Sequence, residues 1–241
     1  MFVQELINFD HNYYMVKTMS TVEQDNSSIK RRSKGEKTKL QILEAAIITL
    51  AKLGIKGTTH RAIAKEADIQ LSLTTYYFRD IDELIQQAII LNSENIMGLA
   101  QEGLVQLIGL INKYDKTSLK TKAVRTNLAA DFSEFSAQYL YNRITTATNA
   151  LAVEQILFAN AKYNPNLENI AKQHKKTLLD PLVALCSYFN KVDPALDAEI
   201  LLAVILQIKY HYISVPIEAV SIDEIRTTLN RIICFVLRVK V

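Results

Sequence analysis

Apolar residues recur at steps of three and four along almost the whole chain, and this helical spacing is the strongest constraint on its fold. Only 6 Gly and 4 Pro occur in 241 residues, so few positions interrupt long helices. No run of alternating β-branched residues is long enough to predict a sheet. Because 49% of the residues are hydrophobic, a large core can be buried. We therefore expect an all-α fold.

Turn and capping residues set the boundaries of the expected helices. Gly54 is expected to end the first clear helix, and Thr59 to cap the next. Asp68 falls where a sharp turn needs a left-handed residue. Asp80, with Glu83 three residues on, resembles a capping box. The predicted helices cover about 36–53, 59–67, 71–78, 80–112, 119–142, 144–162, 166–190, 196–213 and 222–238.

Positive charge is concentrated in one short segment. Residues 30–79 carry a net charge of +7, whereas residues 1–29 carry −3 and residues 80–241 carry −1. A basic head on a nearly neutral body is typical of proteins that bind a polyanion, although a solvated basic face is the commoner cause of such a charge run. Residues 1–29 are expected to be an extension, disordered or weakly helical, that contributes little to the fold.

Several other classes of protein find no support in the sequence. No apolar run is long enough to cross a bilayer, and the N-terminus lacks the features of a secretory signal. Cys186 and Cys234 lie in apolar helical patterns and are expected to be buried reduced thiols. We find no metal-ligand spacing, phosphate loop or nucleophile motif, and so expect no metal, cofactor or catalytic residue. A helical enzyme of unknown activity and a protein-interaction module remain alternatives.

Residues 37–84 combine a helix, a tight turn and a short helix of small polar and aromatic residues, which predicts a helix-turn-helix. The run Thr58-Thr59-His60-Arg61-Ala62-Ile63-Ala64-Lys65-Glu66-Ala67-Asp68-Ile69, then Tyr76-Tyr77-Phe78 and Asp82-Glu83-Leu84, resembles the N-terminal domain of the TetR family. The resemblance implies an N-terminal three-helix helix-turn-helix DNA-binding domain over 30–80. A larger helical domain over 81–241 would then bind an effector and dimerise.

Five positions depart from the pattern of that family. Asp68 replaces a Gly, and Gln70 replaces a Ser or Thr that caps the recognition helix. Leu73-Thr74 inverts the Thr-Leu order that is common in the family, which leaves open which of the two side chains faces DNA. Ile81 stands where many members have Lys. These changes affect individual contacts more than the fold.

The DNA-binding residues follow from the basic arm and from the resemblance. Arg61 is expected to read a base and Thr59 to meet a phosphate, although Arg61 could instead form a surface ion pair with Glu66 or a neighbour. Part of Tyr77 is expected to be core. The expected DNA contacts are Lys30, Arg31, Arg32, Lys34, Thr59, Arg61, Leu71, Ser72, Thr75, Tyr76 and Tyr77.

The predicted helix over 196–213 is apolar nearly all round and the one over 222–238 carries an apolar stripe, so the pair looks like an association surface, with an internal hairpin as the alternative. The resemblance implies that the pair joins its twofold mate in a four-helix bundle, and a homodimer is favoured because a single head makes few DNA contacts. The expected interface residues are Leu201, Ile205, Ile208, Ile225, Leu229 and Ile232. Aromatic residues among polar ones between 119 and 190 point to a small-molecule site, although core packing is the commoner role for each. The expected ligand contacts are Phe132, Phe135, Tyr139, Phe158 and His174.

The resemblance implies a cytoplasmic transcriptional regulator, most simply a repressor. It would bind a palindromic double-stranded DNA operator as a homodimer, and a small-molecule effector of unknown identity would change its affinity. No membrane partner is expected.

Overall fold

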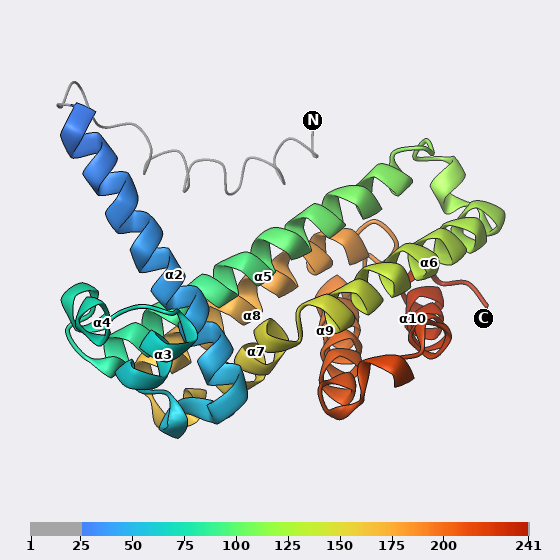
Figure 1. The fold of residues 1–241 in the computed structure, drawn as a ribbon. Coiled ribbons are helices and arrows are strands. Elements are labelled where there is room, and N and C mark those ends of the chain that lie inside the picture. Colours follow the sequence, from blue (N-terminus) through green and yellow to red (C-terminus); the bar gives the residue numbers. More distant parts are fainter. Residues whose placement is uncertain (1–25, 241) are drawn as a thin grey trace. The chain divides into compact units, whose positions relative to one another are not determined.

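A computed structural model describes the backbone of residues 26–240 and the side chains of residues 34–240. The chain divides into two units, Met1–Ile42 and Leu43–Val241, and the division falls within the first described helix. Every regular element in the described range is a helix (Figure 1). The predicted all-α fold is confirmed.

Nine α-helices follow one another, joined by short turns. They are α2 (Asn26–Gly57), α3 (His60–Glu66), α4 (Leu71–Tyr77), α5 (Ile81–Ile111), α6 (Lys122–Thr146), α7 (Thr148–Asn160), α8 (Pro165–Cys186), α9 (Pro194–His211) and α10 (Ile222–Leu237) within residues 26–240. Short 3-10 turns η1 (Ser118–Lys120), η2 (Ala161–Tyr163), η3 (Tyr212–Ser214) and η4 (Ile217–Ala219) lie between the later helices. The bounds from α3 onward agree with the predicted helices to within a few residues.

The first helix differs most from its prediction. Helix α2 begins at Asn26 and not near residue 36, so the end of the predicted extension and the whole basic arm have helical backbone. Residues 1–25 and the side chains of residues 26–33 lie outside the described part of the chain. Gly54 has a φ of 67°, so the helix kinks where the sequence predicted its end. Leu40 of this helix is 44% exposed, although it stands in the apolar pattern of the sequence.

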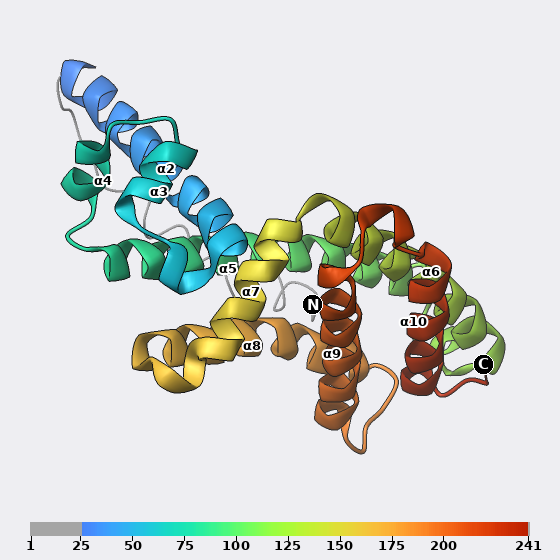
Figure 2. The ribbon, with the colours of Figure 1, turned by 60° about the horizontal axis from the view of Figure 1, so that its bottom comes forward.

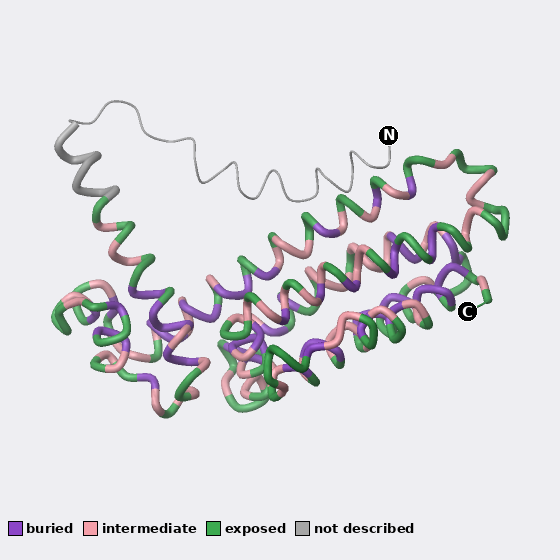
Figure 3. Tube along the Cα trace, turned by 45° about the vertical axis from the view of Figure 1, so that its right-hand side comes forward, coloured by how far each residue is buried: buried purple, intermediate pink, exposed green. Residues whose placement is uncertain are grey.

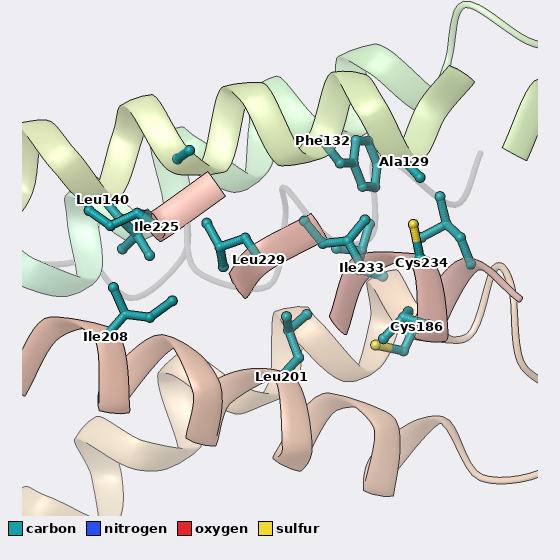
Figure 4. Packing of buried hydrophobic residues seen from close by; sticks show 14 of the residues in the cluster. Ala129, Phe132, Leu140, Cys186, Leu201, Ile208, Ile225, Leu229, Ile233 and Cys234 are labelled. Atoms are coloured by element: carbon teal, nitrogen blue, oxygen red, sulfur yellow. The ribbon is translucent and has the colours of Figure 1, made fainter. Parts of the chain in front are cut away.

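The core of the second unit is built by its C-terminal helices. Helix α10 packs along α6, and α8 packs along α9, in the arrangement seen in Figure 2. Each of these helices buries one side and exposes the other (Figure 3). Figure 4 shows Phe132 of α6 on the side that faces α10, near Ile233, and Leu229 of α10 belongs to the same core.

Both cysteines lie in the same apolar core. Cys186 and Cys234 are free and buried, as the sequence predicted. Burial, with a smaller contribution from Asp197, raises the pKa of the Cys186 thiol to about 12. The thiol therefore stays protonated at neutral pH and packs as a small apolar group.

Candidate functional site

The tight turn between α3 and α4 is closed by a left-handed residue, Asp68. Its φ is 51°, as predicted, and its amide donates to the carbonyl of Lys65 over 3.3 Å. The Ile69 amide donates to the Ala64 carbonyl over 3.0 Å. This pair of bonds is the Schellman arrangement, normally built on Gly. The Asp-for-Gly departure therefore keeps the geometry of a helix-turn-helix.

Side-chain caps fix the first turns of α3 and α5. The Thr59 hydroxyl accepts from the Ala62 amide over 3.2 Å, as predicted for an N-cap. The Asp80 carboxylate accepts from the Glu83 amide over 2.8 Å. Glu83 reaches back and accepts from the Arg79 amide over 2.9 Å, one residue before the position that a capping box uses. Both ends of the helix-turn-helix are thus held by local hydrogen bonds.

Helix α4 presents an exposed polar and aromatic face. Leu71, Ser72, Thr75 and Tyr76 are exposed, and Tyr76 is 78% exposed. The Tyr77 ring is half-buried and lies edge-on to the Tyr76 ring, with 5.0 Å between centroids. Four of the predicted DNA-binding side chains therefore reach solvent from one short helix.

The opposite face of α4 anchors it to the core. Thr74 is fully buried, and its hydroxyl donates to the Leu71 carbonyl over 2.8 Å. Leu73 is half-buried and Phe78 is fully buried. In the inverted Leu73-Thr74 pair, Thr74 therefore faces inward. Gln70 precedes the helix without a side-chain cap.

Two of the predicted cationic DNA contacts, Arg61 and Lys34, have exposed side chains. Arg61 is exposed, and no ion pair to it is found in the part of the chain with described side chains. Glu66 was the alternative ion-pair partner expected for Arg61. It forms a salt bridge with Lys52 instead, over 3.0 Å. Lys34 is exposed, whereas the side chains of Lys30, Arg31 and Arg32 lie outside the described residues.

A second polar site is buried in the helical body. Glu154 of α7 accepts from Lys209 of α9 over 2.5 Å and lies 2.9 Å from Nε2 of His174 on α8. The Glu154 and His174 side chains are fully buried, and the Lys209 side chain is 8% exposed. Three helices thus bring a carboxylate, an ammonium and an imidazole together in the interior.

The charge state of this cluster follows from its hydrogen bonds. Burial alone raises the pKa of Glu154, but the bond from His174 and the charge and bond of Lys209 outweigh burial, so its pKa is lowered. Glu154 is therefore ionised at neutral pH. Burial, with the nearby charge of Glu154, raises the pKa of Tyr210. Nδ1 of His174 and the hydroxyl of Tyr210 are buried without a hydrogen-bond partner among the described residues.

The predicted ligand contacts separate into three groups. Phe158 meets His174 edge-on, with 5.6 Å between centroids, so these two belong to the buried cluster. Phe135 and Tyr139 stack together at 6.3 Å, and the Glu154 charge contributes to the raised pKa of Tyr139, after burial. Phe132 lies in the apolar core with α10 and not beside His174.

Sequence reasoning missed the two charged members of the cluster. Glu154 lies three residues after Leu151 and three before Leu157, both buried. Lys209 lies seven residues after buried Leu202. Each of these charged residues interrupts an apolar helical stripe. That interruption is the sequence signal that could have identified them.

The predicted dimer residues lie mostly in the core of the chain itself. Leu201, Ile208, Ile225 and Leu229 are 7% exposed or less, and Ile205 and Ile232 are half-buried. The large apolar side chains that α9 and α10 leave exposed are Leu196, Ile200 and Phe235. The most exposed apolar side chains of these helices are therefore not among the six predicted interface residues.

Neither a metal site nor a membrane-spanning helix is found among the described residues. No group of three His, Cys, Asp or Glu side chains within them has the spacing of a metal site. Among the same residues, no helix is both long and apolar enough to span a membrane.

Solved structures resemble this fold along most of its length. No protein-family model matches the sequence, and no curated protein does. A transcriptional regulator from Rhodococcus sp. is 18% identical, with a TM-score of 0.61 over 83% of this chain and 96% of its own. A Mesorhizobium loti protein assigned to the TetR family is 15% identical, with a TM-score of 0.62 over 85% and 96%.

A third structure is a transcriptional regulator from Saccharomonospora viridis in complex with choline. It is 15% identical, with a TM-score of 0.59 over 81% of this chain and 95% of its own. At such identities the likeness concerns the fold. The chain has the fold of the TetR-family transcriptional regulators, with an N-terminal helix-turn-helix and a helical C-terminal body.

Proposed function

We propose that this chain is a TetR-family transcriptional regulator, a repressor that binds a palindromic operator as a homodimer. Residues 30–80 form the DNA-binding domain, residues 81–241 form the body, and residues 1–29 precede them. A small-molecule effector bound in the body changes the affinity for DNA. The protein carries out no catalysis in this proposal.

The observation that carries the proposal is the exposed face of α4. A short second helix held by a tight turn is the element that enters the major groove in helix-turn-helix proteins. Here its exposed positions hold hydroxyls, an apolar side chain and a tyrosine ring, all suited to base edges and phosphates. Exposed Arg61 and Lys65 on α3 add positive charge to the same motif.

The proposal includes a homodimer because a single helix-turn-helix makes few base contacts. Two heads would occupy half-sites about 34 Å apart along DNA. Exposed Ile200 and Phe235 on α9 and α10 are candidates for the contact with a second copy. The choline complex of the Saccharomonospora viridis regulator supports an effector role for the body, because that protein shares its fold.

Electrophoretic mobility shift with DNA from upstream of the chain's own gene tests the proposal. We expect retention of that DNA at nanomolar protein, and a loss of affinity on the order of a thousandfold between about 50 and 200 mM salt. A scrambled duplex of the same length is the control. Equal affinity for both duplexes would overturn sequence-specific regulation and favour a general polyanion-binding role.

A further inference from the structure

The exposed stripe of α10 changes in charge from one end of the helix to the other. Its members recur at helical spacing and are all exposed: Glu224, Thr227, Thr228, Arg231, Phe235 and the C-cap residue Arg238. On the other side of the helix, Ile225, Leu229 and Ile233 lie in the core (Figure 4). The stripe is therefore acidic near the start of α10, small and polar in the middle, and basic and aromatic near the end.

The charges of this stripe are not balanced within the chain. Arg231 forms no salt bridge with any residue whose side chain is described. The Glu224 carboxylate accepts a hydrogen bond from the Tyr212 hydroxyl over 3.1 Å, and no cation among the described side chains pairs with it. Glu224 and Arg231 lie about 10 Å apart along the helix axis. A partner can satisfy both only if its own charges run in the opposite direction.

We propose that α10 pairs antiparallel with α10 of a second copy of this chain, about a two-fold axis beside Thr227 and Thr228. The inference rests on the proposed homodimer, and it names the residues that select the partner. Glu224 of each copy faces Arg231 of the other. Because the axis relates the two copies, this charge pair forms twice.

The spacing along the stripe gives one register. In an antiparallel pair, a step forward along one helix is matched by an equal step back along the other. Glu224 lies three residues before Thr227, and Arg231 lies three residues after Thr228. The register that joins the charges therefore sets Thr227 against Thr228 at the axis, where small side chains let two helices approach closely.

The surface around the acidic end suits the basic end of a second copy. Asp223, Glu224, Thr227 and Thr228 line an open hollow, into which the Arg231 side chain of the other copy would extend. The same register carries Phe235, which is 51% exposed, toward Ile217 of the other copy, which is 50% exposed. The apolar contacts supply affinity, whereas exposed charge pairs contribute mainly to the choice of partner and of direction.

Charge reversal with complementation between two chains tests this pairing. Sedimentation equilibrium of the full chain gives the dimer dissociation constant of the parent, Glu224→Arg and Arg231→Glu. Each variant alone sets like charges against each other twice, so its dissociation constant should rise about tenfold or more. An equimolar mixture of the two variants restores both attractive contacts and should return to within about twofold of the parent. Glu94→Arg on α5 and Lys175→Glu on α8 reverse exposed charges outside the stripe and should dimerise as the parent does.

A cysteine cross-link checks the register without reversing a charge. Thr228→Cys places a thiol beside the axis, so the two copies should join in a disulfide under mild oxidation. Arg238→Cys is the matched control, because it lies on the same stripe but about 30 Å along the axis from its symmetry mate. The native Cys186 and Cys234 are buried. This measurement decides the register even if Glu224→Arg fails to fold.

Three results would overturn the inference. They are single reversal variants that dimerise as the parent does, a mixture as dissociated as its components, and a cross-link in Arg238→Cys but not in Thr228→Cys. A parent chain that is monomeric at micromolar concentration would overturn the proposed homodimer as well. A dimer that passes these tests but fails the operator assay would keep the pairing and overturn the regulator.

Discussion

The Lys52 ammonium lies 3.0 Å from both carboxylate oxygens of Glu66 and joins α2 to α3. The salt bridge engages the Glu66 carboxylate, which could otherwise have paired with Arg61. Both partners are partly exposed, so the pair contributes little to stability. Its consequence is that Arg61 keeps its guanidinium free on the exposed side of the helix-turn-helix.

The left-handed turn at Asp68 predicts an unusual mutational pattern. Replacement of Asp68 by Ala should lower the free energy of unfolding by about 1 kcal/mol, because a Cβ without a local hydrogen-bonding group tolerates positive φ poorly. Asp68→Gly should leave that free energy within about 0.5 kcal/mol of the parent. Urea unfolding of the three proteins measures the difference. An Ala variant as stable as the parent would contradict the assigned turn.

The buried cluster predicts a pH-dependent stability. The pKa of Glu154 is lower in the folded than in the unfolded chain, so its contribution is complete above the ordinary carboxyl pKa, about 4.3. The contribution is lost as pH falls through the lowered folded value. At pH 6, Glu154→Gln should cost about 3–5 kcal/mol, because Lys209 is left buried and unpaired.

Denaturant unfolding of the parent and Glu154→Gln from pH 6 to pH 3 checks this expectation. The difference in unfolding free energy should shrink with acidification, because protonated Glu154 resembles Gln. The double variant Glu154→Gln/Lys209→Met is the control and should recover much of the loss. A difference that stays constant across this range would show that Glu154 is not an ionised partner of Lys209.

Self-association should depend on the exposed apolar residues of α9 and α10. Phe235→Glu or Ile200→Glu should shift the mass in light scattering from about twice 27.3 kDa to 27.3 kDa at micromolar protein. Val105→Glu is the matched control, because Val105 is as exposed as Phe235 but lies on α5. A parent protein that is monomeric at this concentration would contradict the dimer.

Local signals predicted the helices well because capping and turn residues act over a few positions. Asp68 and Asp80 each adopt the role expected from the sequence, whereas Gly54 kinks α2 where the sequence predicted its end. The start of α2 at Asn26 was missed because residues 26–35, the first part of the helix, are mostly polar and carry no apolar stripe. Helix propensity alone is a weak guide to whether such a polar segment is helical.

The buried cluster was harder to predict because it depends on tertiary pairing. Glu154 and Lys209 are 55 residues apart, and a lone charge on a helix is usually exposed. Among the polar residues between the aromatics, Asn127, Gln138, Asn149 and Gln155 are exposed, whereas His174 is buried. For the predicted dimer residues, the helical spacing of apolar residues identified the apolar faces. It could not tell which face packs against α6 within the same chain.

The central claim is that α3 and α4 read DNA, and one titration tests it most directly. Fluorescence anisotropy compares the parent, Arg61→Ala and Lys172→Ala on the upstream operator and on a scrambled duplex. Lys172 is an exposed cation on α8, so both variants lose one positive charge. We expect Arg61→Ala to lose about 1–3 kcal/mol on the operator alone, and Lys172→Ala to match the parent on both. If a folded Arg61→Ala binds both duplexes as the parent does, Arg61 does not read the operator.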